Sequence, residues 1–303
     1  MSLWDQLVVR SLPFVPRPLV GYFSRPYIAG QMMDEALKSV HQLNQEGFMA
    51  TLDILGEGVA DVSQTRVTRD EYLQLINRIP ERRLDANVSI KLTALGLNLD
   101  KGLCLENLRV LVKRAAELNS FIRIDMEDIT TTDATLEIHR ILAAEFPGHV
   151  GVAFQAYLRR SVADAAGLIR MKANIRLCKG IYVEPYAAAY RDPEIIRRNF
   201  IELLEMQLKG GMYVGIATHD EILVWESERL IRRLGLGREQ YEFQMLLGVA
   251  EKLRRTILDA GHRLRVYVPY GQSWYAYSVR RLRENPRLAG LVAQRALGLS
   301  PKG

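Results

Sequence analysis

The densest group of residues able to do chemistry lies near the C-terminus, in the stretch YAYSVRRLRE at residues 275–284. On a helix, four of these side chains would share one face, at positions i, i+3, i+4 and i+7: Tyr277, Arg280, Arg281 and Glu284. Two neighbouring guanidinium groups suit bidentate binding of a small carboxylate or phosphate, and a carboxylate one turn further on can hold them. A solvated charged helix face is the simpler interpretation, but the aromatic Tyr277 on the same face favours a ligand clamp.

Eight short apolar runs precede this stretch, and each carries polar side chains at or near its C-terminal end. The runs are residues 48–57, 87–95, 120–128, 149–158, 173–182, 212–220, 241–248 and 263–271. Their polar residues are Asp53, Glu57, Lys91, Thr93, Asp125, Glu127, Asp128, Gln155, Tyr157, Arg159, Arg160, Arg176, Lys179, Tyr182, Thr218, His219, Asp220, Gln244, Tyr267 and Tyr270. Because an unpaired buried charge is costly, such charges must pair with one another or with a ligand. An internal ion-pair network is the alternative for any one residue, but polar groups at all eight ends together favour a site.

Stretches with a helical repeat separate the apolar runs, for example residues 105–118, 193–208, 221–234 and 248–260. Strands alternating with helices predict βαβ units and a parallel sheet. Eight such units match an α/β fold, the (β/α)8 TIM-like barrel of about 250 residues, better than an open doubly wound sheet. A Rossmann-like domain with an added helical piece is the alternative. In such a barrel, the C-terminal strand ends build the active site, which is where these polar residues lie.

The remaining segments flank the predicted barrel. Residues 1–45 form an N-terminal helical arm that ends in a helix over residues 31–45, and arginine and proline residues interrupt its apolar beginning. Neither a signal peptide nor a membrane span is therefore expected there. Residues 46–303 form the barrel domain, which includes C-terminal helices around residues 274–284 and 288–299.

Composition is that of an ordinary folded protein, with 303 residues, 48% hydrophobic and 25% charged. Disordered and collagen-like classes are therefore excluded. The two cysteines, Cys104 and Cys178, form no C-x-x-C or zinc-type cluster, so a reducing, cytoplasmic compartment is expected.

The net charge of +6 is concentrated at one end of the chain. Residues 251–303 contain eleven basic and three acidic residues, a net charge of +8, so the net charge of residues 1–250 is −2. An anionic ligand site, an anionic membrane surface and nucleic acid are the three candidate partners. Nucleic acid is the weakest of them, because no zinc-finger, RNP or helix-turn-helix pattern accompanies the charge, and we expect no nucleic-acid partner.

Several common catalytic motifs are missing from the sequence. The five histidines form no H-x-H or H-E-x-x-H pattern, so no metal is expected at the site. No G-x-S-x-G elbow is present, and no G-x-G-x-x-G opens a helix after a strand. Serine hydrolysis and a Rossmann cofactor site are therefore disfavoured.

Seven ordered motifs resemble the proline dehydrogenase family, the flavoenzymes that oxidise L-proline, in its small monofunctional bacterial form. They are SIKLTAL at 89–95, IDME at 124–127, FQAYL at 154–158, RLCKGIY at 176–182, ATHD at 217–220, FQML at 243–246 and the stretch 277–286. The last, with paired arginines before Leu-x-Glu-Asn, is the most specific. Two departures concern packing: Ile181 stands where a smaller residue is common, and Cys178 where valine is frequent.

The resemblance implies two sets of site residues. Arg280 and Arg281 would bind the substrate carboxylate together with Lys91, Glu284 would pair with the arginines, and Asp125 would support the pocket. The walls around the pyrrolidine ring would be Tyr182, Leu246, Tyr267 and Tyr277. The flavin-binding set would be Gln155, Arg176, Lys179, Gly180, Thr218 and His219. The catalytic residues implied are Lys91, Arg176 and Tyr267.

The resemblance further implies oxidation of L-proline to Δ1-pyrroline-5-carboxylate by hydride transfer to flavin N5, the first step of proline catabolism to glutamate. Electrons would pass to a membrane quinone, and the cofactor would be FAD, with FMN left open. Tyr277 favours proline over its hydroxylated relative, because a bulky wall leaves little room for a hydroxyl. The basic C-terminal end and the arm could bring a cytoplasmic protein to the inner membrane surface. No residue stands out as the base for the substrate amine.

Two alternatives remain at this stage. One is another flavin barrel, of the methylenetetrahydrofolate reductase type. The other is a non-catalytic carboxylate-binding or nucleic-acid-binding protein that has kept the barrel. Reduction of a bound flavin by proline separates them from the first interpretation.

Overall fold

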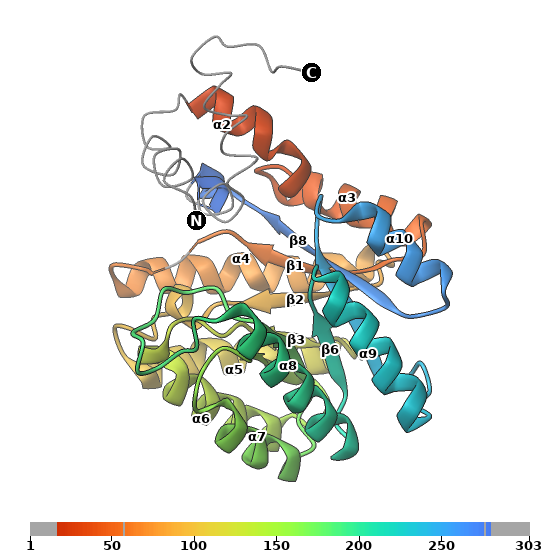
Figure 1. The fold of residues 1–303 in the computed structure, drawn as a ribbon. Helices are drawn as coiled ribbons and strands as arrows, with labels where there is room; N and C mark the ends of the chain where they lie inside the picture. The colour runs from red at the N-terminus through yellow and green to blue at the C-terminus, as the bar shows by residue number, and fades with distance from the viewer. Residues whose placement is uncertain (1–16, 57, 276, 280–303) are drawn as a thin grey trace.

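The computed structural model describes residues 17–56, 58–275 and 277–279. Within these ranges eight parallel strands close into a barrel in chain order, which confirms the predicted α/β fold (Figure 1). The strands are β1 (Met49–Ile54), β2 (Ala86–Ile90), β3 (Ile122–Ile124), β4 (Val150–Gln155), β5 (Ile175–Cys178), β6 (Val214–Ala217), β7 (Tyr241–Leu246) and β8 (Leu264–Tyr270). Pairing of β1 with β8, from Met49 opposite Arg265 to Ile54 opposite Tyr270, closes the ring.

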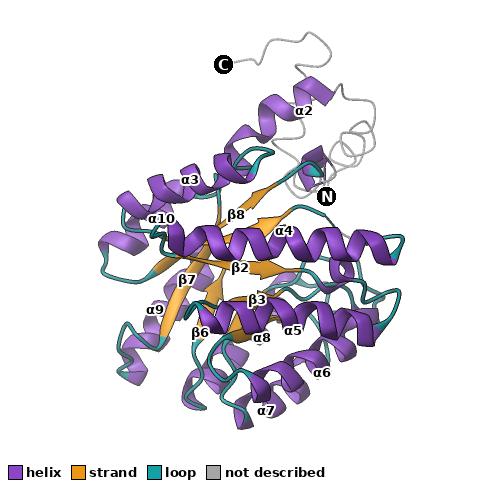
Figure 2. Ribbon diagram, turned by 180° about the vertical axis from the view of Figure 1, so that it is seen from behind, coloured by secondary structure: helices purple, strands orange, loops and turns teal. Residues whose placement is uncertain are grey.

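Helices follow the strands and cover the outside of the barrel (Figures 1 and 2). They are α4 (Val62–Glu81), α5 (Lys101–Glu117), α6 (Ile129–Glu145), α7 (Ser161–Arg170), α8 (Pro193–Lys209), α9 (Glu221–Leu234) and α10 (Glu251–Asp259), with a short 3-10 turn, η3 (Leu92–Leu95), after β2. Each predicted apolar run coincides with a strand, but every strand is shorter than its run, mainly because the final residues of the run belong to the loop that follows. The helix predicted over 248–260 begins only at Glu251, since Gly248 and Ala250 adopt positive φ angles of 72° and 49°.

Aspartate side chains begin most of these helices at the edge where the strands end. Asp61, Asp100, Asp128, Asp192 and Asp220 each accept a hydrogen bond from a backbone N–H in the first turn of α4, α5, α6, α8 and α9, respectively. An aspartate at this position accepts a hydrogen bond from a backbone N–H that the helix itself leaves unpaired, and its negative charge interacts favourably with the positive end of the helix dipole. The sequence therefore determines locally where these five strand-to-helix loops end.

The N-terminal helices pack around the point where the barrel closes. α3 (Met33–Gln45) packs against β1 and β8 on the outside of the sheet, beside α10 (Figures 1 and 2). α2 (Arg17–Ser24) lies beyond it, and a Cβ at Gly21 would lie 3.3 Å from the Trp274 ring at the start of the helical segment that follows β8. The division of the chain into an arm over 1–45 and a barrel domain over 46–303 stays a prediction.

Alternate residues of each strand face opposite sides of the sheet, and the two sides differ in chemistry. Residues toward the helices are apolar and buried, as with Leu52, Ile124, Val152 and Ile216. Residues toward the barrel axis include charged and hydrogen-bonding groups that contact one another across the interior, such as Arg176 of β5 with Ser89 of β2. Barrel interiors are ordinarily filled with branched apolar side chains, so a polar interior marks a place where stability alone does not dictate the residues.

Candidate active site

A cavity of about 540 Å³ opens at the C-terminal ends of the strands. This volume lies in the range of roughly 300–1,000 Å³ that is typical of ligand pockets. Its lining includes twelve of the residues expected from the sequence: Lys91, Asp125, Gln155, Arg176, Lys179, Gly180, Tyr182, Thr218, His219, Leu246, Tyr267 and Tyr277. Residues from β2 through β8 and the segment after β8 thus meet in one hollow.

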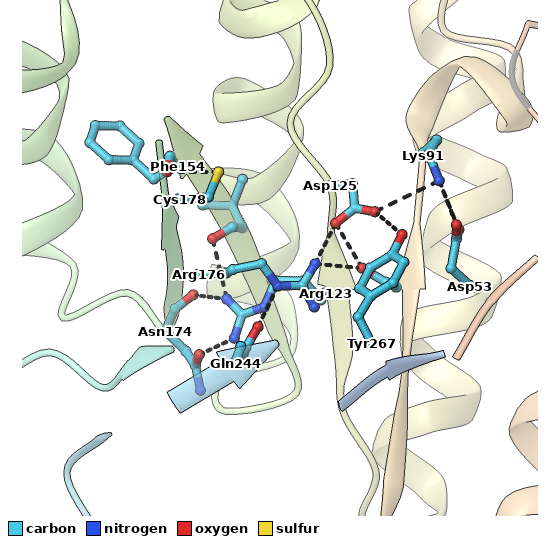
Figure 3. A network of polar contacts seen from close by, with 12 residues as sticks. Asp53, Lys91, Arg123, Asp125, Phe154, Asn174, Arg176, Cys178, Gln244 and Tyr267 are labelled. Carbon is cyan, nitrogen blue, oxygen red and sulfur yellow. Dashed lines mark hydrogen bonds and ion pairs between the residues drawn. The ribbon is translucent and has the colours of Figure 1, made fainter. Parts of the chain in front are cut away.

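Asp125, which directly follows β3, is the centre of the polar floor of this cavity (Figure 3). Its Oδ1 accepts hydrogen bonds from Arg176 Nη1 at 2.6 Å and from Ser89 Oγ at 2.8 Å. Its Oδ2 accepts one from the Tyr267 hydroxyl at 2.9 Å and lies 3.9 Å from Lys91 Nζ. Burial raises the pKa of Tyr267 well above its ordinary value, so this hydroxyl stays protonated and keeps donating.

Lys91 is held by a second carboxylate deeper in the barrel. Its Nζ donates to both oxygens of Asp53, at 2.9 and 2.8 Å, and Asp53 is fully buried. Burial raises the pKa of Asp53, and the Lys91 charge opposes that change. A buried ion pair of this kind orients the ammonium group rather than adding much stability.

Arg176 is held from two sides. Its Nη1 contacts Asp125 and Ser89, while Nε donates to Gln244 Oε1 at 2.5 Å. The guanidinium carbon lies 5.2 Å from the centre of the Tyr267 ring, within cation–π range. Among the described residues Nη2 has no protein hydrogen-bond partner, and Arg176 lines the cavity. A buried cation that keeps a donor without a protein acceptor indicates a site for an electron-rich group of a ligand.

The opposite rim carries hydrogen-bonding groups around β5 and β6. Lys179 Nζ lies 2.5 Å from Asp220 Oδ2, and Arg197 Nε lies 2.7 Å from the same oxygen. Burial would raise the pKa of Asp220, but hydrogen bonds from Lys179 and Arg197 lower it, so this carboxylate stays charged. His219 Nε2 accepts a hydrogen bond from the backbone N–H of Leu246 at 2.8 Å, which places its proton on Nδ1.

Gly180 shapes the wall beside Lys179. Its φ is +107°, and a Cβ there would come within 2.1 Å of the Tyr157 ring. Only glycine adopts this conformation at that distance without strain. Gly180 itself lines the cavity, so this close approach of backbone and ring shapes the cavity wall.

Comparison with known proteins identifies the family to which these residues belong. The proline dehydrogenase family model matches residues 36–294. The chain belongs to the proline dehydrogenase family. It is 38% identical to a proline dehydrogenase of Deinococcus radiodurans over 96% of this chain and 98% of that one. It is 36% identical to proline dehydrogenase 1 of Bacillus subtilis strain 168 over 89% of each chain.

A solved structure extends the likeness to three dimensions. Proline utilization A (PutA) from Bdellovibrio bacteriovorus, inactivated by N-propargylglycine, matches with a TM-score of 0.82 and 26% identity over 92% of this chain. The chain spans 36% of the length of that protein. The shared part is therefore the barrel and the elements that surround its cavity.

Three residues that the family resemblance implied lie outside the described ranges: Arg280, Arg281 and Glu284. Their segment starts as a helix at Trp274, and Tyr277 on the same segment is buried and lines the cavity. The roles given to the whole set of site residues stay predictions.

The structure also places in the site several residues to which the sequence assigned no role. Asp53 stood out only as a polar strand end, Ser89, Asp220 and Gln244 lay in the family motifs without a role, and Glu242 did not stand out at all. For Ser89, Glu242 and Gln244 the signal was a polar residue two positions away from another polar residue, since this spacing in a strand puts both on one face. The pairs are Ser89 with Lys91, Arg123 with Asp125, Glu242 with Gln244 and Arg265 with Tyr267.

In the described part of the chain, no helix has the length and apolar character needed to span a bilayer. Within the same residues, His, Cys, Asp and Glu side chains form no group of three that could hold a metal ion.

Proposed function

We propose that this chain oxidises L-proline to Δ1-pyrroline-5-carboxylate, the first step of proline catabolism to glutamate. The observation that carries the proposal is the cluster of Lys91, Arg176 and Tyr267 around Asp125 on the floor of the cavity. In a protein of the proline dehydrogenase family, this cluster gives a small anionic substrate a fixed point and leaves the rest of the cavity for its ring.

Cationic side chains would hold the substrate at its carboxylate. Lys91, oriented by Asp53, would act with Arg280 and Arg281, which belong to the segment that continues from Tyr277. Because guanidinium groups bind carboxylates through two parallel hydrogen bonds, such a clamp fixes direction as well as position. Glu284 would pair with the arginines and keep them aligned.

Apolar and aromatic walls would hold the pyrrolidine ring. Tyr182, Leu246 and Tyr277 line the same cavity as Lys91. Holding the reacting atoms about 3–3.5 Å apart removes much of the entropic part of a reaction barrier. The amine must lose its proton before oxidation, and the nearby positive charges of Lys91 and Arg176 would disfavour the protonated form.

We propose that the cofactor is a flavin, held by Gln155, Arg176, Lys179, Gly180, Thr218 and His219. The donors fit: Arg176 lines the cavity and its Nη2 has no protein acceptor among the described residues, and the Gln155 side chain is anchored by its hydrogen bond to the Glu127 carbonyl at 2.7 Å. A bound flavin supplies the acceptor for the two electrons and the hydrogen that proline loses. The positive charge of Arg176 would stabilise negative charge on that acceptor.

We propose that the flavin is FAD rather than FMN. The test is mass spectrometry of the molecule released by acid from the purified protein. A mass of FAD supports the proposal, and a mass of FMN contradicts it.

We propose that a membrane quinone accepts the electrons. The protein would be cytoplasmic and would bind the inner membrane surface to deliver the electrons to the quinone. The support is the balance of +8 over residues 251–303, because each basic residue near an anionic bilayer contributes about 1 kcal/mol to binding. Sedimentation with anionic vesicles at low and high salt tests this step. Equal sedimentation with neutral vesicles contradicts it.

The activity is tested by adding L-proline to the purified protein without air and recording its absorbance. Loss of the oxidised flavin bands is expected, and a folate substrate should cause none. A protein that contains flavin but is not reduced by proline would refute the proposal. Replacing Arg280 and Arg281 with methionine should abolish proline binding while the flavin is retained.

A further inference from the structure

Gln244 of β7 connects the cavity to a buried ion pair below it. Its Oε1 accepts from Arg176 Nε at 2.5 Å, and its Nε2 donates to Glu242 Oε1 at 2.6 Å. Gln244 is buried and also lines the cavity, whereas Glu242 lies two residues earlier on the same strand face. One amide thus joins Arg176 to a carboxylate on the inner side of the barrel.

The amide of Gln244 can take only one orientation. Arg176 has donors and no acceptor, so the glutamine must present its oxygen to it. An ionised Glu242 has acceptors and no donor, so the glutamine must present its nitrogen there. A flipped amide would lose both hydrogen bonds, and the two partners therefore determine the direction of this connection.

Glu242 is itself held rigidly in its charged form. Arg265 donates to its two oxygens at 2.8 and 3.1 Å, and the Tyr213 hydroxyl donates to Oε2 at 2.9 Å. Although burial opposes ionisation, the Arg265 charge and these hydrogen bonds lower the pKa of Glu242 to about 2. The carboxylate is consequently an acceptor throughout the neutral range.

Gly215 on the neighbouring strand β6 provides the space for this arrangement. A Cβ at Gly215 would lie 2.4 Å from Gln244 Nε2 and 2.9 Å from its Cδ. Any larger residue would displace the glutamine from between Arg176 and Glu242. Backbone φ does not require glycine here, because Gly215 is outside the positive-φ positions. The absence of a side chain at 215 is therefore a matter of space for Gln244.

We propose that Gln244, set in direction by Glu242 and accommodated by Gly215, is a positioning residue that aims the free donor of Arg176 at the bound flavin. Asp125 and Ser89 hold Nη1, and Gln244 holds Nε, so the plane of the guanidinium is determined and Nη2 is the donor that would remain for a ligand of the cavity. This inference rests on the proposed function, since it assigns the ligand of Nη2 to a flavin. It adds that Gln244 and Glu242, on the inner side of the barrel, control the electron affinity of the flavin.

The first test replaces Gln244 with methionine, which keeps the length of the side chain and removes both hydrogen bonds. The reduction potential of the flavin, measured by dye-coupled titration without proline, should become more negative because the guanidinium is no longer aimed. We expect kcat to fall about 10- to 100-fold, as for other misplaced groups, with KM for proline changed less than about twofold. Gln207→Met is the matched control, because Gln207 is fully buried in α8 away from the cavity lining.

The second test exchanges the two side chains. Gln244→Glu alone places two carboxylates side by side, and Glu242→Gln alone removes the charged acceptor for the glutamine amide, so each should shift the potential. In the double variant, the carboxylate introduced at position 244 would accept from Arg176. The amide introduced at position 242 would donate to that carboxylate and still accept from Arg265 Nη2 and the Tyr213 hydroxyl, but it would lose the hydrogen bond from Arg265 Nε. The potential should therefore return part of the way toward the wild-type value. A residue that only fills space gives no such rescue.

The outcomes separate the two proposals. A wild-type flavin that proline does not reduce refutes the proposed function. A wild-type flavin that proline reduces, with a Gln244→Met potential equal to that of Gln207→Met, refutes the positioning role alone. Lowered potentials in both single exchange variants with no recovery in the double variant also contradict it, because the direction of the amide would then be irrelevant.

Discussion

Replacing Asp53 with asparagine tests whether the buried Asp53–Lys91 pair holds the floor of the site. Lys91 Nζ lies 2.8 Å from Asp53 and 3.9 Å from Asp125. With an effective dielectric constant of about 20, these distances correspond to attractions of about 6 and about 4 kcal/mol. The substitution therefore leaves the Lys91 ammonium paired with Asp125 at the longer distance.

The expected loss of stability follows from burial. Because burial raises the pKa of Asp53 in spite of Lys91, the intact pair contributes little net stability. Removing one partner is different, since a buried charge is then poorly compensated, at a cost of about 3–5 kcal/mol. Asp125 remains within 3.9 Å, so we expect the lower end, about 3 kcal/mol. For a protein of 303 residues that corresponds to a fall in Tm of about 5 °C.

Thermal unfolding followed by circular dichroism measures this change, and Glu137→Gln is its control. Glu137 pairs with Lys101 at a similar 2.9 Å, but the side chains of Glu137 and Lys101 are 42% and 51% exposed. The control should lose less than about 1 kcal/mol, and only Asp53→Asn should raise KM for proline. Equal losses in the two variants, or no loss in Asp53→Asn, would refute the argument from burial.

Three further changes follow from single contacts. Gly180→Ala should lower the free energy of unfolding by about 1–3 kcal/mol, because φ is +107° at this position and a Cβ would meet the Tyr157 ring. It should also lower the flavin-to-protein ratio after purification. An unchanged Tm would contradict this prediction. Because Arg265 holds the pKa of Glu242 at about 2, below its ordinary 4.5, the stabilisation from this carboxylate is complete above about pH 4.5 and is lost as pH falls toward 2. Acid unfolding of Glu242→Gln should therefore depend less on pH in that window, and parallel curves would oppose the assignment. Asp220→Asn keeps the helix cap but weakens the hydrogen bond that orients the Lys179 ammonium. Flavin titrated into the apoprotein should therefore bind about tenfold more weakly, while folding is unchanged. Equal affinity for flavin would argue against this role of Asp220.

The order and type of the elements could be predicted from the sequence because both depend on short-range patterns. A strand shows itself over four to eight residues, and a helix over two or three turns. The eight apolar runs and the boundaries of α8 and α9 were therefore accessible without coordinates. Polar residues at the run ends were visible for the same reason, and Asp125, Lys91 and Arg176 could be placed at one edge of a barrel.

The partners of those residues were decided by the tertiary structure. Lys91 and Asp53 are 38 residues apart, Arg176 and Asp125 are 51 apart, and Arg176 and Gln244 are 68 apart. Whether such side chains meet depends on the register and closure of the whole barrel, which no local pattern contains. The alternating pattern of a strand predicts that a charged side chain points inward. Only the closed ring of eight strands determines which opposite charge it contacts there, because that partner belongs to a strand distant in sequence.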